Sequence, residues 1–225
     1  MLNSLFSKYD NIVVLDIETT GLNPKDDEII ELGAIHVTQK TEPYHIENEL
    51  DSLVELSSGR SLPEIVVKLT GITEEQLSKQ GKPKAEISKE LVKILDNKNT
   101  LLVAYNAQFD LSFIYYFLHR YQSADVLKKL KLLDAMTIYK DRRDYPHKLE
   151  NAVAAYNIEN ENAHRAIDDA KATLKLLAQM SLEKDDLDRY INLFGYNAKY
   201  GISGAKISSV KYLPQNFDRK QALYD

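Results

Sequence analysis

Residues 11–22 read NIVVLDIETTGL. The first seven of them are mostly apolar and β-branched, whereas the residues after Glu18, together with Asn23 and Pro24, have the composition of a loop. A short apolar run bounded by turn residues predicts a buried central strand that ends in a turn. Because side chains alternate between the two faces of a strand, we expect Asp16 and Glu18 to project to the same side near its end.

The segments that follow predict more strands and then helices. Short connections between residues 11–17, 29–37 and 44–50 indicate three strands in an antiparallel meander. Two more strands are predicted at residues 101–105 and 131–134. Helical pieces begin at residue 63, and helices are predicted at about residues 83–95, 108–121, 135–140, 148–156 and 165–180. This order indicates an α/β fold in which helices cover a mixed sheet.

The composition excludes several classes of site. The 225 residues contain no cysteine, which excludes disulfide frameworks, thiolate zinc sites and cysteine nucleophiles, so any metal must be held by oxygen or imidazole. No window approaches the roughly 20 apolar residues of a membrane helix, and the N-terminus lacks the features of a secretion signal. We therefore expect a soluble, cytoplasmic protein of at most about two domains that does not contact membranes.

The charge balance bears on nucleic acid as a partner. Lys and Arg number 29 against 34 Asp and Glu, so the formal net charge is −5. This balance is opposite to that of a protein that coats nucleic acid. A negative net charge is compatible with nucleic-acid binding if several acids gather in one site, because bound divalent ions reverse the local sign of the field. Whether nucleic acid is a partner therefore depends on where the carboxylates lie.

Acidic residues occur at three places that a sheet and its helices can bring together. Asp16 and Glu18 end the first strand, Asp110 begins one predicted helix, and Asp169 lies in the first turn of another, five residues after His164. Taken singly, each acid has an ordinary explanation as a turn residue or a first-turn charge, and Asp168 competes with Asp169 for any role. Together, converging carboxylates would destabilise the fold without cations, whereas Mg²⁺ or Mn²⁺ prefers such oxygen ligands.

The same residues carry a family resemblance. Residues 14–22, 106–110 and 164–170 resemble the three exonuclease motifs of the DEDDh, or DnaQ-like, 3'→5' exonucleases. Residues 31–34 and 69–73 match further; the latter is similar to a segment of the proofreading exonuclease, the epsilon subunit, of bacterial DNA polymerase III. The His-x-x-x-x-Asp spacing selects Asp169 over Asp168. One departure is Tyr105, where many relatives have His at a position that is not catalytic.

The resemblance covers about residues 10–180. It implies a ribonuclease H-like fold with a mixed five-stranded sheet, an exonuclease domain at residues 1–180 and a C-terminal extension at residues 181–225. It also implies release of 5'-nucleoside monophosphates from a 3' end by a two-metal mechanism, in which two ions of Mg²⁺ or Mn²⁺ clamp the scissile phosphate.

Roles for individual residues follow from the resemblance. His164 would be the general base. The metal ligands would be Asp16, Glu18, Asp110 and Asp169. The loop after the first strand would meet the terminal nucleotide, and two residues beside Asp110 are candidates for contacts to sugar and base, although core packing explains Phe109 equally well. These substrate-binding candidates are Thr19, Thr20, Gly21, Leu22, Asn106 and Phe109.

The motifs leave the polymer open. The main interpretation is hydrolysis of the single-stranded 3' end of DNA in proofreading or repair; the alternatives are an RNA 3'-trimming or oligoribonuclease-like enzyme and a binding module without activity. A module that had lost activity should lack some of the five functional residues, and none is missing.

The C-terminal extension has a composition of its own. Residues 189–217 hold four basic residues and no acidic one, with several Tyr and Gly. The alternatives for this segment are a contact to nucleic acid, docking of a polymerase or helicase partner, and a tail packed on the domain. Its Gly201-x-x-Gly204-Ala205-Lys206 lacks the spacing of a nucleotide-binding phosphate loop.

Overall fold

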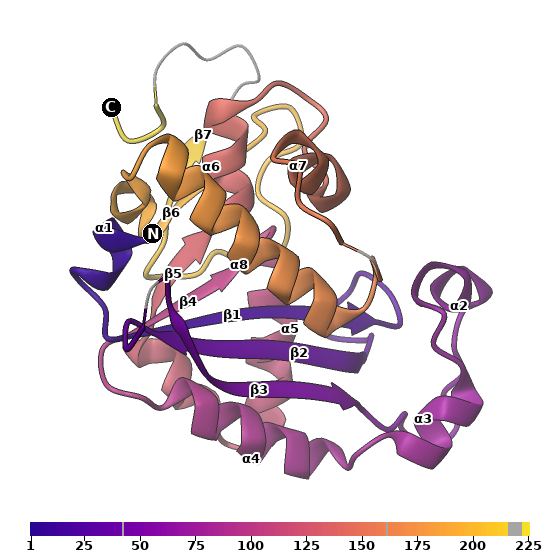
Figure 1. Ribbon diagram of the computed structural model, residues 1–225. Coiled ribbons are helices and arrows are strands. Elements are labelled where there is room, and N and C mark those ends of the chain that lie inside the picture. Colours follow the sequence, from indigo (N-terminus) through magenta and orange to yellow (C-terminus); the bar gives the residue numbers. More distant parts are fainter. Residues whose placement is uncertain (42, 161, 216–221) are drawn as a thin grey trace.

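The computed structural model describes residues 1–41, 43–160, 162–215 and 222–225 (Figure 1). The strands are β1 (Asn11–Thr19), β2 (Ile29–Thr38), β3 (His45–Leu53), β4 (Thr100–Ala104), β5 (Lys131–Asp134), β6 (Leu193–Tyr196) and β7 (Lys211–Pro214). The α-helices are α1 (Asn3–Phe6), α2 (Glu64–Thr70), α3 (Glu74–Gln80), α4 (Lys84–Leu95), α5 (Ala107–Arg120), α6 (Ala135–Arg142), α7 (Leu149–Ala155) and α8 (Ala166–Glu183). Two 3-10 helices are η1 (Ala124–Lys129) and η2 (Leu187–Tyr190). None of the helices in these ranges combines the length and apolarity that a bilayer crossing requires.

The main sheet has five strands in the order β3-β2-β1-β4-β5. β2 pairs antiparallel with both β1 and β3, while β4 runs parallel to β1 and to β5. The mixed five-stranded sheet and the antiparallel meander are thus confirmed. β3 continues past its predicted end at residue 50, because Leu53 still pairs with Glu31 of β2.

Helices cover both faces of this sheet. Ile12 and Val14 of β1 lie in one buried cluster with residues of α6, α7 and α8. Val13, Leu15 and Ile17 lie in a second cluster with residues of α4 and α5. Figure 1 shows α8 crossing one side of the sheet and α4 lying on the other. Since burying one such side chain stabilises the fold by about 1.5–3 kcal/mol, the alternation fixes the face that every β1 side chain takes.

Gly33 of β2 lets α8 approach the sheet closely. It is the β2 partner of Asp16, and a Cβ atom there would lie 2.3 Å from the backbone of Ala166 and of Ile167. Only a residue without a side chain permits that approach. The first turn of α8 is therefore pressed against β2, beside the strand that carries Asp16 and Glu18.

The C-terminal extension contains a two-stranded parallel sheet, β6 and β7, which the sequence did not lead us to predict. Strands of four residues are too short for a periodic signal. Tyr190, Leu193 and Phe194 are buried in the two main clusters, so this part of the extension packs on the rest of the fold, while most of residues 198–209 are exposed. Residues 216 and 217 of the basic segment lie outside the described residues. The division at residue 180 stays a prediction, and α8 itself continues to Glu183.

Candidate active site

Asp16 and Glu18 lie at the end of β1, on the face that α8 covers. They continue the alternation of Ile12 and Val14, whose side chains belong to the cluster with α8. Across the ladder Glu18 pairs with Glu31, and an irregularity follows it before Thr19. The structure thus places both carboxylates on one side, as the alternation predicts, with both half-buried.

Asp110 reaches the same place from the first turn of α5. Asn106 precedes this helix in a left-handed conformation (φ 66°) and supplies no side-chain cap. Asp134, at the end of β5, takes over that role, since its Oδ1 accepts hydrogen bonds from the backbone N–H of Asn106 (3.0 Å) and of Ala107 (3.2 Å). Asp110 itself is buried and accepts a hydrogen bond from the backbone of Ile17, which ties α5 to β1.

Asp169 and His164 come from the start of α8. The Asp169 carboxylate is buried and accepts hydrogen bonds from Asn160 Nδ2 (2.8 Å) and from the backbone N–H of His164 (3.1 Å). His164 has a positive φ of 69° and is exposed. Asp168 lies instead where its charge acts on Asp51 and Arg165. The structure therefore places Asp169 in the acidic cluster.

These groups converge. Glu18, His164 and Asp169 each bring one potential ligand atom to within 4.8 Å of the other two. Among the residues that the structure describes, no Lys or Arg forms an ion pair with any of the four carboxylates. Burial, and then repulsion by Asp110, Asp169 and Glu18, raises the pKa of Asp16 well above its usual value.

The other acids respond in the same way. Burial, followed by the charges of Asp169, Glu31 and Asp110, raises the pKa of Glu18 to about 8. Burial also raises the pKa of both Asp110 and Asp169. Carboxylates held together without a counter-charge retain protons, and a divalent cation would relieve both the desolvation and the repulsion. All-oxygen donors of this kind fit Mg²⁺ or Mn²⁺.

Glu31 positions the start of α8. Its carboxylate is fully buried and accepts hydrogen bonds from Arg165 Nε (2.8 Å) and Nη2 (2.6 Å) and from the backbone N–H of Ala166 (2.9 Å). Since the N-cap residue Arg165 has no side-chain cap hydrogen bond, Glu31 satisfies a free N–H of the helix from a neighbouring strand. Glu31 lies in a segment that matches the family pattern, but no signal in the sequence predicted that it holds the start of α8.

The loop after β1 is held by its own side chains. Thr20 is buried; its hydroxyl donates to Asp27 Oδ1 (3.1 Å) and accepts from the backbone N–H of Glu28 (3.0 Å). A Cβ atom at Gly21 would lie 2.5 Å from Asp27 Oδ2, so a larger residue there would have to displace the Asp27 carboxylate that holds Thr20. Thr19 donates to the carbonyl of Gly21 (2.6 Å), and Leu22 is 84% exposed at the tip.

The remaining two substrate-binding candidates differ in their surroundings. Asn106 is exposed, at the turn into α5. Phe109 is partly buried against the α4/α5 cluster, with its ring centroid 5.0 Å from that of Phe113. Contacts of these six residues with a nucleotide stay a prediction. Tyr105, the departure from the family pattern, is buried and donates its hydroxyl to the carbonyl of His147 (2.8 Å).

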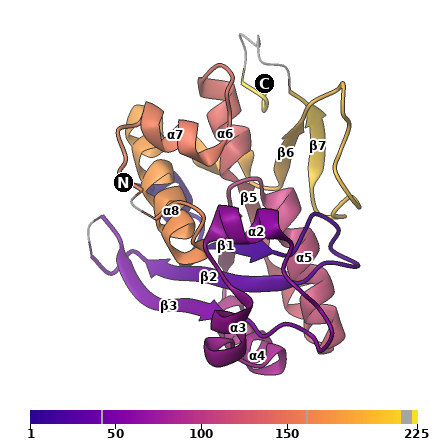
Figure 2. The same ribbon diagram turned by 90° about the vertical axis from the view of Figure 1, so that its right-hand side faces the viewer.

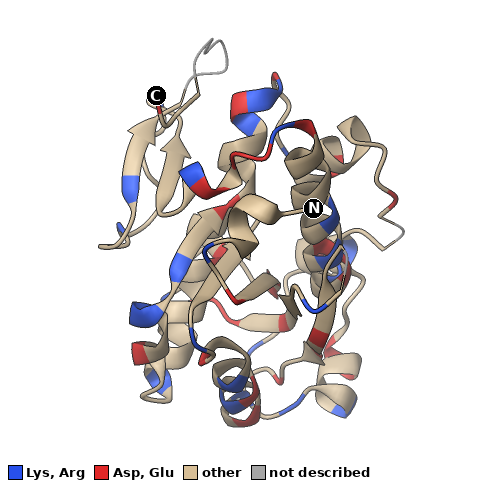
Figure 3. Cartoon of the chain, turned by 60° about the vertical axis from the view of Figure 1, so that its left-hand side comes forward, with Lys and Arg blue, Asp and Glu red and all other residues tan. Residues whose placement is uncertain are grey.

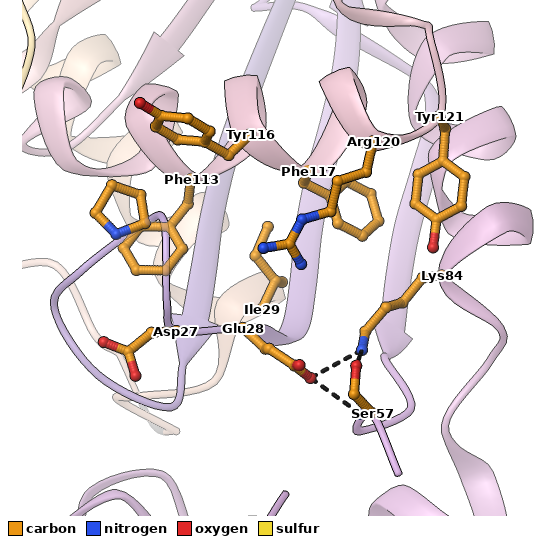
Figure 4. A pocket seen from close by; sticks show the side chains of 11 residues that line it. Asp27, Glu28, Ile29, Ser57, Lys84, Phe113, Tyr116, Phe117, Arg120 and Tyr121 are labelled. Atoms are coloured by element: carbon orange, nitrogen blue, oxygen red, sulfur yellow. Dashed lines mark hydrogen bonds and ion pairs between the residues drawn. The ribbon is translucent and has the colours of Figure 1, made fainter.

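A cavity of about 200 Å³ lies between this loop and α5 (Figure 4). Its aromatic wall is formed by Phe113, Tyr116, Phe117 and Tyr121. Opposite that wall, Glu28 forms an ion pair with Lys84 (2.8 Å) and accepts a hydrogen bond from the backbone N–H of Ser57 (3.0 Å). None of the four clustered carboxylates lines this cavity, and Glu28, the buried acid in its wall, already pairs with Lys84. We therefore assign these residues a structural role, which is to hold the loop after β1 in place.

A family model described as an exonuclease, RNase T, matches residues 13–177. The chain belongs to this exonuclease family. The match begins in β1 and ends in α8, so it contains all five residues that the sequence analysis assigned to catalysis.

Curated relatives agree with the family. This exonuclease chain is 34% identical over 177 residues to the DNA polymerase III PolC-type protein of Caldanaerobacter subterraneus, covering 76% of the chain and 12% of the relative. It is 31% identical over 202 residues to the DNA polymerase III subunit epsilon of Buchnera aphidicola, covering 85% and 77%. The chain thus spans only about an eighth of the PolC-type relative, and 22% of a relative in Staphylococcus haemolyticus named 3'-5' exonuclease DinG.

Solved structures share the fold. Escherichia coli exonuclease I in complex with a dA16 oligonucleotide matches with a TM-score of 0.69 and 19% identity, over 80% of this chain and 42% of that one. The ribonuclease H-like exonuclease fold expected from the sequence is therefore confirmed.

Proposed function

We propose that this chain is a metal-dependent 3'→5' exonuclease that releases 5'-nucleoside monophosphates from the single-stranded 3' end of DNA. The observation that carries the proposal is the convergence of Glu18, His164 and Asp169 to within 4.8 Å, with the half-buried Asp16 and the buried Asp110 close enough to raise one another's pKa or that of Glu18. Two acids in one short motif are common. A cluster of acids that are shielded from water without an ion-pair partner, beside an exposed histidine, lowers the stability of the fold, and such clusters are typical of functional sites.

Asp16, Glu18, Asp110 and Asp169 would hold the metal. Two bound ions would stabilise the charge on the attacking and leaving oxygens of the phosphodiester and lower the pKa of water. The protein's part is to fix the donors: β1 holds two of them, the Asp134 cap orients the helix that carries Asp110, and Asn160 with the His164 backbone orients Asp169.

His164 would accept the proton from the attacking water. Its ring is exposed while its backbone N–H is tied to Asp169, so the imidazole can meet a bound strand without losing its place beside the donors. General-base removal of a proton contributes about 10² to 10⁴ in rate. The exposed Leu22 and Asn106 flank the cluster on two loops and would contact the terminal nucleotide.

Relatives support DNA as the polymer and proofreading or repair as the role. They include proteins named for DNA polymerase III, and the matching exonuclease I was solved with a DNA oligonucleotide. We accordingly propose a polymerase as the partner and the cytoplasm as the location.

The test is degradation of matched 3'-labelled substrates. Single-stranded DNA, a duplex with a 3' mismatch, and RNA of the same sequence are incubated with Mg²⁺, Mn²⁺ or a chelator, and the products are separated. The proposal expects 5'-mononucleotides from DNA, faster from the mismatched end than from a paired one, and nothing with chelator. Faster hydrolysis of RNA would assign the enzyme to RNA trimming, and endonucleolytic fragments would contradict the proposal.

A further inference from the structure

We propose that residues 197–210, the segment between β6 and β7, form a binding surface for the single strand that leads to the active site. We call this segment the strap. The inference rests on the proposed function and names a second place where the substrate is held, outside the five catalytic residues. Its occupant is a single-stranded nucleic acid, recognised by phosphate charge and by base stacking.

One side chain of α5 anchors the strap. Gln108 Nε2 donates hydrogen bonds to the carbonyls of Ser203 (2.9 Å) and Ala205 (2.8 Å), and Gln108 Oε1 accepts from the hydroxyl of Tyr212 (2.6 Å). The same hydroxyl accepts from the backbone N–H of Ile207 (2.9 Å). The Gln108 amide thus holds Ser203 and Ala205 directly, and Ile207 through Tyr212. No local sequence pattern indicates this role.

The anchor sets the strap on the helix that carries Asp110. Gln108 precedes Asp110 by two residues, so the two side chains leave different faces of α5 but lie only about 3 Å apart along its axis, at the same end of the helix. Gly204 lies against the same helix, since a Cβ atom there would be 3.7 Å from Ser112 Oγ. Figure 2 shows the segment between β6 and β7 descending beside α5. A strand that ends at the carboxylates has the strap within its reach.

The exposed groups of the strap suit a polyanion. Lys199 and Lys206 are exposed, as is Lys211 at the start of β7, and within the described part of the chain none of the three has an ion-pair partner. Arg189, the fourth basic residue of the segment 189–217, lies 3.9 Å over the ring of Tyr224 and pairs with Asp225 (3.9 Å), so it is not available in the same way. Figure 3 shows β6, β7 and the strap with basic but no acidic residues. On a chain of net charge −5 this is a local reversal of sign.

An aromatic ring accompanies these charges. Tyr200 is 77% exposed, and Lys199 Nζ lies 5.3 Å from its ring centroid. Bases stack on such rings without sequence preference, while lysines track the backbone. The other exposed residues of the strap are small, with Ser203, Gly204 and Ala205 at its turn. A docking surface for a protein would expose large apolar anchors, whereas Ile202 and Ile207 are half-buried and Val210 is buried, so nucleic acid is the better match.

The dependence on substrate length separates the strap from the active site. kcat/KM is measured with Mn²⁺ on a dinucleotide and on an oligodeoxythymidylate of about 12 nucleotides. The full chain is compared with the double variant Lys199→Gln/Lys206→Gln and with Tyr200→Ala and Tyr200→Phe. The matched control is Lys128→Gln/Lys129→Gln, which removes the same charge from exposed lysines in η1.

If the strap binds the strand, its variants should lose kcat/KM on the long substrate and keep it on the short one. The ratio of kcat/KM for the long to the short substrate should fall about 5- to 150-fold in Tyr200→Ala and recover in Tyr200→Phe, which keeps the ring. In the lysine double variant the slope of log affinity against log salt should decrease by about 1.4, because two phosphate contacts are lost. The control should match the wild type in both measurements.

Binding measured without hydrolysis keeps the two proposals apart. The affinity for the same oligonucleotide is determined by fluorescence anisotropy with chelator. Weaker binding in the strap variants supports the strap even if the wild type hydrolyses nothing, which would overturn the proposed function alone. Strap variants that bind and cleave like the control would overturn the strap and leave this segment to packing or to a protein partner.

Discussion

Two glutamates on either side of the loop after β1, the buried Glu28 and the half-buried Glu18, have opposite environments. Glu28 is buried, but its carboxylate pairs with Lys84 (2.8 Å) and accepts the backbone N–H of Ser57, and Arg60 Nε lies 3.7 Å away. Burial acts to raise the pKa of Glu28, yet the hydrogen bonds from Lys84 and Ser57 outweigh it and hold that pKa below the usual value. Glu18 has no such partner, and its pKa rises to about 8.

The contrast separates structural acids from functional ones. Both glutamates are shielded from water, but Lys84 lowers the pKa of Glu28, whereas no Lys or Arg of the described residues forms an ion pair with Glu18. Glu31 belongs with Glu28, since Arg165 pairs with it at 2.6 Å. Of Glu28, Glu31 and the four acids of the cluster, the cluster acids are the ones left for an external cation.

The largest effect is expected for the unpaired acids. Asp16→Asn, Asp110→Asn and Asp169→Asn should each lower kcat by more than about 10⁴, because each removes a metal donor and the loss exceeds that of a general base. Without metal, the same variants should be as stable as the wild type or more stable, since each removes one member of a repelling cluster. Single-turnover hydrolysis and thermal unfolding with chelator check both statements. Asp168→Asn is the control and should stay active; an inactive Asp168→Asn beside an active Asp169→Asn would show that the register of α8 was wrongly assigned.

His164→Ala should lower kcat by about 10² to 10⁴ and leave metal binding in place. The histidine is assigned a proton-transfer role although its ring lies among the possible ligand atoms. Calorimetry with Mn²⁺ decides between these roles. Loss of a bound ion in His164→Ala would make the side chain a ligand and remove it from the general-base position.

Glu28→Ala should destabilise the protein by about 3 kcal/mol, because it leaves the mostly buried Lys84 without its partner. The pKa of Glu28 is lowered on folding, so its contribution is present above its ordinary pKa of about 4.5 and is lost as the pH falls below that value. Urea unfolding at pH 7 and at pH 4 should show a smaller difference between variant and wild type at pH 4. Glu64→Ala, which breaks an exposed pair with Lys68, should change stability by less than about 0.5 kcal/mol. An equal loss of unfolding free energy in the two variants would contradict the expected difference between a buried and an exposed ion pair.

Glu31→Gln should lower metal affinity or kcat by about 10- to 100-fold. Loss of a residue that orients a metal ligand, without itself binding the metal, has an effect of this size. The variant keeps an oxygen for the N–H of Ala166 but weakens the pair with Arg165, so the start of α8 is held less firmly. The affinity for Mn²⁺ should fall while the KM for a dinucleotide stays constant. A change in thermal stability with no change in Mn²⁺ affinity would restrict Glu31 to folding.

The sequence was sufficient for the main sheet because its signals were local. The alternation in residues 11–17 placed Asp16 and Glu18 on one face, as the structure shows; the spacing from His164 selected Asp169, which lies beside Glu18 and His164, and its role stays a prediction. The residues that orient the site gave no such signal. Asp134 caps α5, Asn160 holds Asp169 and Gln108 anchors the strap through side-chain hydrogen bonds between distant segments or irregular loops. Such contacts leave no periodicity, and strands as short as β6 and β7 do not either.

Calorimetric titration of Mn²⁺ at pH 7, in two buffers of different ionisation enthalpy, tests most directly whether the unpaired acids form a metal site. Carboxylates with raised pKa values must give up protons when the ions bind, so the wild type should bind two ions with release of protons. Asp16→Asn should lose at least one ion and release fewer protons, whereas Glu28→Gln should titrate like the wild type. Mn²⁺ binding that is equally tight in Asp16→Asn, or that releases no protons in the wild type, would contradict the assignment.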